Sequence, residues 1–126
     1  MSMAQTYLRF TKCQRGSNAV EFALIAPALI MLVVGTMWAC LLVFSAASLH
    51  YSVEQAARCY SVNSTLCGTP SSAQTYAQSQ YRGTNAPTFL ASTPACGHQV
   101  AATVTVALNS GIKTWNVPLS ATSCFP

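Results

Sequence analysis

The segment 22-FALIAPALIMLVVGTMWACLLVFSAASL-49 is 28 residues long and contains no formally charged residue. As a helix rising about 1.5 Å per residue, it is longer than the roughly 30 Å hydrocarbon core of a bilayer. The whole chain has 126 residues, of which 52% are hydrophobic and only 6% charged, far below the roughly 25% of an ordinary soluble domain. The sequence therefore predicts one membrane span and, beside it, a single small domain.

The basic residues on either side of this segment predict its orientation. Arg9, Lys12 and Arg15 precede it, with no acidic residue among the first 16 positions, and the first basic residue after it is Arg58. Cytoplasmic flanks of membrane spans carry an excess of Lys and Arg. We therefore expect the N-terminus in the cytoplasm and the residues from Leu49 onwards on the outer side.

Four of the six cysteines lie on that outer side, where disulfides form and small domains depend on them. Four cysteines allow three pairings. We favour Cys59 with Cys67, which closes a short local loop, and Cys96 with Cys124, which ties the C-terminal end back to the domain. A metal site that uses Cys96 and His98 is the weaker interpretation, because the sequence lacks paired CxxC spacing.

The helix is predicted to continue beyond the membrane. Its apolar residues keep helical spacing on one face and are Leu49, Val53, Ala56, Ala57 and Tyr60. Glu54 and Arg58 stand four residues apart on the opposite face. We interpret them as a solvated pair that contributes a few tenths of a kcal/mol, and not as catalytic residues.

A second, short helix is predicted to follow. Thr69 and Pro70 are typical of a helix N-cap and first helical residue. The helix is expected to run to about Arg82, with Gly83 as its stop. Its buried side would consist of Ala73, Tyr76, Ala77 and Tyr81.

The C-terminal part is predicted to form strands. Residues 84–97 are interpreted as a loop with a short strand at 88–90. From Gln99 apolar residues alternate with polar or small ones, which predicts a strand with Val100, Ala102, Val104, Val106 and Leu108 on one face. Residues 109–111 form a turn into a partner strand at 112–117, with Trp115 and Val117 facing the same core. Pro118 places this strand at an edge or ends it. The predicted fold class is α+β: a long N-terminal membrane-spanning helix that continues into a small outer domain with a short helix and a small antiparallel sheet, stapled by disulfides.

Glu21 stands at the edge of the apolar segment and needs an explanation. A charged group inside the bilayer costs several kcal/mol unless it is paired. In the simplest interpretation Glu21 lies at the headgroup level of an ordinary signal anchor.

The residues around Glu21 support a second interpretation. The stretch Gly16-Ser17-Asn18-Ala19-Val20-Glu21-Phe22 resembles the processing site of type IV pilin-like proteins. The resemblance implies that a prepilin peptidase cuts after Gly16, so that Ser17 begins the mature chain and Glu21 is its fifth residue. The Glu21 carboxylate could then pair with the new amine on Ser17 of a neighbouring subunit.

A longer stretch narrows the resemblance. Residues 15–35, RGSNAVEFALIAPALIMLVVG, resemble the TadE-like pseudopilins of tight-adherence (Tad) pili, including Pro27 six residues after Glu21. Pro27 removes one helical hydrogen bond and is expected to kink or loosen the helix. One position departs from the pattern, because Trp38 stands where many members carry a second acid. A role of that acid in subunit contacts is therefore not expected here.

The resemblance implies a minor pilin or pseudopilin with three regions. Residues 1–16 would be a cleaved basic leader, 17–48 the transmembrane and assembly helix, and 49–126 a periplasmic or extracellular α+β domain. Glu21, Phe22 and Pro27 would set assembly and register. The expected partners are the prepilin peptidase, other pilin and pseudopilin subunits, and the pilus assembly platform of the inner membrane. The expected location is that membrane, with a single pass, and the pilus itself after assembly.

The sequence is also compatible with other functional classes. A single-span anchored binding domain that is not processed is the main alternative. Cleavage by signal peptidase near Ser45 is disfavoured, because the apolar region far exceeds the usual 7 to 15 residues. An enzyme is the weakest interpretation, since the chain has no Asp, and His50 and His98 have no visible nucleophile partner. We expect no cofactor and no metal. A nucleic-acid partner is not expected either, because loss of the leader lowers the net charge from +4 to +1.

Overall fold

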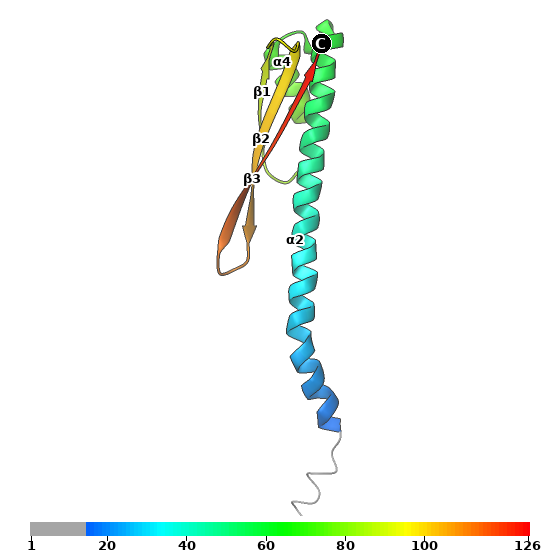
Figure 1. Ribbon diagram of the computed structural model, residues 1–126, viewed down its shortest axis with the longest axis vertical. Coiled ribbons are helices and arrows are strands. Elements are labelled where there is room, and N and C mark those ends of the chain that lie inside the picture. The colour runs from blue at the N-terminus through cyan, green and yellow to red at the C-terminus, as the bar shows by residue number, and fades with distance from the viewer. Residues whose placement is uncertain (1–14) are drawn as a thin grey trace, which may run out of the picture. The chain divides into compact units, whose positions relative to one another are not determined.

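The computed structural model describes residues 15–126 as a long helix, two shorter helices and a three-stranded sheet (Figure 1). The elements are α2 (Arg15–Val62), α3 (Ser64–Cys67), α4 (Pro70–Gln80), β1 (Thr88–Ser92), β2 (His98–Asn109) and β3 (Thr114–Phe125). The chain divides into two compact units, of which the first ends at Met37 and the second is Trp38–Pro126. The helices, the antiparallel sheet and two disulfides confirm the predicted α+β fold.

Helix α2 is 48 residues long and is rich in Ala and Leu, which favour helix. It continues through Pro27. Proline has no amide hydrogen, so one carbonyl in the preceding turn loses its helical partner. A helix is one of the few backbone forms that satisfies its other polar groups without water, which a lipid environment requires.

The predicted apolar stripe on the second half of α2 is confirmed. Leu49, Val53, Ala56 and Ala57 are at most 1% exposed, and Tyr60 is 8% exposed. Ser52 is also fully buried, and its hydroxyl donates a hydrogen bond to the carbonyl of Leu49 at 2.8 Å. A buried hydroxyl bonded in this way carries no unpaired donor. The core therefore forms along this stripe.

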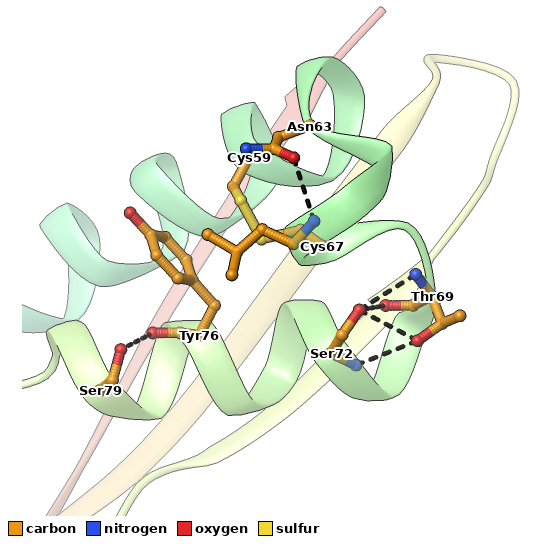
Figure 2. Close-up of a disulfide and its surroundings, with 8 residues drawn as sticks. Cys59, Asn63, Cys67, Thr69, Ser72, Tyr76 and Ser79 are labelled. Atoms are coloured by element: carbon orange, nitrogen blue, oxygen red, sulfur yellow. Dashed lines mark hydrogen bonds between the residues drawn. A yellow bond between two sulfur atoms is a disulfide. The ribbon is translucent and has the colours of Figure 1, made fainter.

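Between α2 and the body of α4 lie two helix N-caps, that of α3 and that of α4 (Figure 2). Asn63 caps α3, and its side-chain oxygen accepts a hydrogen bond from the amide of Leu66 at 3.0 Å. Thr69 and Ser72 form a reciprocal capping box at the start of α4, with Pro70 as the first helical residue. The predicted start of this helix is confirmed. Such caps stabilise a helix by about 1 kcal/mol.

The end of α4 differs from the sequence prediction. The helix ends at Gln80, and Tyr81 already has an extended backbone. The amide of Arg82 donates to the hydroxyl of Ser48 on α2 at 2.8 Å. The helix therefore ends before Gly83, where the chain leaves α4 and the Arg82 amide bonds to α2. On the predicted buried side, Ala73 and Ala77 are buried, while Tyr76 and Tyr81 are half-buried.

The strands form one antiparallel sheet in the order β1-β2-β3. The predicted alternation on β2 is confirmed, because Val100, Ala102, Val104 and Val106 are buried and Leu108 is half-buried. These residues, with Phe89 on β1 and Ala121 on β3, face the sheet's core side. The hydrophobic cluster that joins the sheet to α2 and α4 consists of Leu49, Val53, Ala56, Ala57, Ala77, Phe89, Val100, Ala102, Val104 and Ala121.

The last strand corrects the prediction in two respects. It begins at Thr114, so that Ile112 lies in the turn and is 99% exposed. It also runs past Pro118 to Phe125, which an edge strand permits because only one of its sides pairs with a neighbour. Trp115 pairs with Leu108 but is 52% exposed, so the prediction that it faces the core is wrong. The expected edge position of Pro118 is confirmed.

Candidate functional site

The feature with the clearest functional meaning is the exposed apolar surface of α2. From Val20 to Phe44 most of its large apolar side chains are 41 to 76% exposed, with Leu24 and Met31 the most exposed of them, while Trp38 and Leu42 are half-buried. The helix over Asn18–Val62 is long and apolar enough to cross a membrane, and only 6% of its most apolar window is buried. A soluble protein rarely exposes so large a contiguous apolar surface. Such a surface is typical of a helix that contacts lipid or other proteins.

The predicted site residues lie at the beginning of α2. Glu21, Phe22 and Pro27 are all in the helix, where Glu21 is exposed and Phe22 is 69% exposed. Gly16 and Ser17 belong to the same helix by their backbone. Residues 1–14 of the predicted leader, which include Arg9, Lys12 and Cys13, lie outside the residues that the structure describes. Processing and register at these positions thus stay predictions.

The first disulfide connects the end of α2 to α3. It joins Cys59 to Cys67 across a Cα–Cα distance of 5.7 Å. Between them, the amide of Asn63 donates to the carbonyl of Cys59 at 2.8 Å, which closes the bend. Figure 2 shows the ring of Tyr76 beside this bridge, and Cys67 is fully buried with Tyr60 and Ala73. This pairing is the one that the sequence favoured.

The second disulfide joins Cys96, just before β2, to Cys124 on β3 across a Cα–Cα distance of 6.3 Å. It is also the favoured pairing. Gly97 between Cys96 and β2 has a φ of +114°, a region that suits glycine. A side chain there would also collide with the carbonyl oxygen of Phe125. Close approach of the two strand ends therefore depends on this glycine.

Sequence reasoning missed a contact between these two linked regions. The rings of Tyr60 and His98 meet edge-on, with centroids 4.3 Å apart. The hydroxyl of Ser61 also donates to the carbonyl of Pro126 at 2.7 Å. The alternation that predicts β2 gave no sign of either contact, since both depend on how the end of α2 meets the sheet.

The charged pair singled out in the sequence lies on the surface of the outer domain. Glu54 and Arg58 are exposed, as predicted, and line a surface hollow of about 350 Å³ together with Gln55, Ser123 and Phe125. Among residues 15–126 the structure contains no group of three His, Cys, Asp or Glu residues that could hold a metal ion.

Burial changes the titration of one tyrosine in the outer domain. Burial raises the pKa of Tyr81 above its ordinary value, and the nearby Ser45 hydroxyl has a smaller, opposite effect. The two hydroxyls are not in hydrogen-bonding geometry, so that burial decides the direction. Tyr81 forms part of the packing around the core, not of a reactive site.

The fold and the exposed helix fit a single-pass membrane-anchored protein with a small disulfide-linked α+β domain. The family model described as TadE-like protein matches residues 16–58 of the chain. The match confirms the predicted resemblance over this stretch, which begins at Gly16 and ends next to Cys59. No curated protein and no solved structure matches the chain.

Proposed function

We propose that this chain is a minor pilin or pseudopilin subunit that a prepilin peptidase processes between Gly16 and Ser17 for assembly of a Tad-type adhesion pilus. The observation that carries the proposal is the extent of the TadE-like match. It begins at Gly16, includes Glu21 and covers the exposed apolar part of α2. The proposed role is structural and needs no catalytic group.

Cleavage would change the surroundings of Glu21. Removal of the leader exposes a new amine on Ser17, and Glu21 then stands four residues into the helix. The first amides of a helix lack internal partners and carry partial positive charge. A carboxylate there is favoured, and it can also reach the amine of an adjacent subunit. These two interactions would stabilise the charge of Glu21 at the edge of the lipid.

Assembly would then replace lipid with other helices around α2. Phe22, Leu24, Ile25 and Leu29 are each more than half exposed and form a ready packing surface. Between apolar helices, burial alone favours many alignments. A buried polar group is better attested for fixing register than for adding stability, and Glu21 would supply that function.

The remaining assignments follow from this role. The partners would be the prepilin peptidase, other pilin and pseudopilin subunits, and the assembly platform of the inner membrane. Before assembly the N-terminus would be cytoplasmic and the outer domain periplasmic. The two disulfides support an outer location of the domain, because disulfides persist in oxidising compartments.

N-terminal sequencing tests the proposal directly. The protein is recovered from membranes of cells with and without the pilus-system peptidase. We expect a chain that starts at Ser17, and we expect this start to disappear without the peptidase or in Gly16→Ala. An intact N-terminus in both strains would overturn processing and favour an unprocessed single-span anchor with an outer binding domain. A start near Ser48 would indicate a secreted domain instead.

A further inference from the structure

The turn between β2 and β3 combines three side chains that suit a membrane surface. Ile112 is 99% exposed, Trp115 is 52% exposed, and the ammonium group of Lys113 lies 6.0 Å from the centre of the Trp115 ring. Lys113 is the only formally charged residue after Arg82. The rest of the hairpin therefore presents no charge that would resist contact with lipid.

The hairpin extends along α2 in the direction of the apolar part of that helix. Strand β2 begins with His98 beside Tyr60. From there the hairpin extends back along the part of α2 that belongs to the same compact unit, which begins at Trp38 (Figure 1). The steps between its twelve residues, about 3.3 Å each, add up to roughly 36 Å from the first Cα to the last, which is the length of about 24 helical residues. For a strand parallel to the helix, this length counted back from Tyr60 ends at Thr36. The hairpin is inclined to α2 (Figure 1), so its turn lies level with a slightly later part of the helix, close to Trp38 at the beginning of the compact unit.

That level coincides with the outer boundary of the predicted span. The apolar run begins at Phe22, and about twenty helical residues cover a hydrocarbon core of roughly 30 Å. The outer boundary then falls near Leu41. Within the same compact unit as the hairpin, Leu41 and Phe44 are 41% and 52% exposed. The apolar surface of the helix thus continues to the level of the hairpin turn.

We propose that the hairpin turn, formed by Ile112, Lys113 and Trp115, rests in the outer interfacial layer of the bilayer that α2 crosses. Tryptophan favours this layer, because its ring is apolar and its N–H still reaches polar groups. Lys113 extends its charge toward lipid phosphates while its stem follows the apolar surface. The outer domain then contacts the membrane at two places, the helix and the turn, which fixes its tilt.

This inference requires only that α2 crosses a bilayer, so that its failure is separate from failure of processing. The test uses the full chain reconstituted into vesicles of phosphatidylcholine and phosphatidylglycerol. Trp38→Phe leaves Trp115 as the single tryptophan. We expect lipids brominated near the headgroup end of their chains to quench its fluorescence strongly, and we expect iodide on both sides of the membrane to quench it weakly.

A matched control places the single tryptophan at the other end of the sheet. Leu90 is 66% exposed and pairs with Ala101 near the start of β2. In a chain carrying Trp38→Phe, Trp115→Phe and Leu90→Trp, we expect the opposite result, with strong iodide quenching and weak lipid quenching. Equal lipid quenching at the two positions, or none at Trp115, would overturn the proposal.

A second variant tests the turn itself. Ile112→Asn with Lys113→Glu, in the Trp38→Phe chain, removes the apolar and cationic contacts at exposed positions. We expect loss of lipid quenching at Trp115, with both disulfides still formed. Unchanged lipid quenching would show that these two side chains do not hold the turn at the membrane, and would likewise overturn the proposal.

Discussion

The ring of Tyr60 meets the ring of His98 edge-on, with centroids 4.3 Å apart and ring planes at 69°. Tyr60 lies near the end of α2, and His98 is the first residue of β2. The Cys59–Cys67 disulfide adjoins the first ring, and Cys96–Cys124 joins the strands beside the second. The contact therefore links two regions that are each held by a disulfide.

Removal of the Tyr60 ring should weaken the outer domain. Tyr60 is only 8% exposed, and loss of a buried aromatic ring costs about 3 to 5 kcal/mol. We expect Tyr60→Ala to lower the free energy of unfolding by about 3 kcal/mol. Tyr60→Phe keeps the ring and serves as the control, with a much smaller loss. Pulse proteolysis of the detergent-solubilised chain in increasing urea measures both.

The two disulfides should differ in their contribution. They separate their cysteines by 8 and 28 positions. Because a longer closed loop restricts the unfolded chain more, the expected stabilisation is about 2.5 kcal/mol for the first and about 3.5 kcal/mol for the second. Replacement of each cysteine pair by alanine, followed by urea unfolding, tests this order. A larger loss for the Cys59–Cys67 pair would contradict it.

Gly97 and Gly111 form a natural comparison. Both have positive φ, at +114° and +81°. A Cβ at Gly97 would collide with the backbone of Phe125, whereas a Cβ at Gly111 would meet nothing within 4 Å. We expect Gly111→Ala to cost about 1 kcal/mol through its backbone conformation alone. Gly97→Ala should cost clearly more and slow formation of the Cys96–Cys124 bridge, as measured by thiol labelling. Equal effects would mean that the strand ends separate easily.

Charge at position 21 should matter for assembly and not for membrane insertion. If Glu21 pairs with the amine of a neighbouring subunit, Glu21→Gln removes that attraction. We expect about tenfold less of the variant in sheared pili, which corresponds to about 1.4 kcal/mol. Glu21→Asp, which keeps the charge, should lose less. Immunoblots of the sheared and membrane fractions measure the ratio, and normal incorporation of Glu21→Gln would count against the pairing.

The outer domain should lose stability at alkaline pH through Tyr81. Burial raises the pKa of Tyr81 above 10.0 in the folded chain. As the pH rises past about 10, the unfolded chain releases this proton while the folded chain retains it, so that ionisation favours unfolding. Well below pH 10 both states keep the proton, so that Tyr81 does not affect stability there. Tyr81→Phe should therefore reduce the loss of stability between pH 9 and 11, as followed by urea unfolding. An unchanged pH dependence would contradict this account.

Much of the fold is visible in the sequence because it depends on local patterns. The uncharged run from Phe22 to Leu49 predicts the long helix, since the hydrophobic effect and helical rise act on consecutive residues. The stripe that includes Leu49 and Val53, and the alternation around Val104, show which faces are buried. The stretch around Gly16 and Glu21 predicted the resemblance that the TadE-like match confirms.

Other features were settled only by tertiary structure. The bond between Arg82 and Ser48 ends α4 early, and Tyr60 finds His98 across 38 positions. Trp115 has the alternation of a core residue, yet it lies 52% exposed. The sequence by itself determined which residues are apolar and at what period they recur. The tertiary structure decided where a buried face of a helix or strand ends and which distant residues are in contact. Both depend on how far one element extends over another, which a local periodicity does not show.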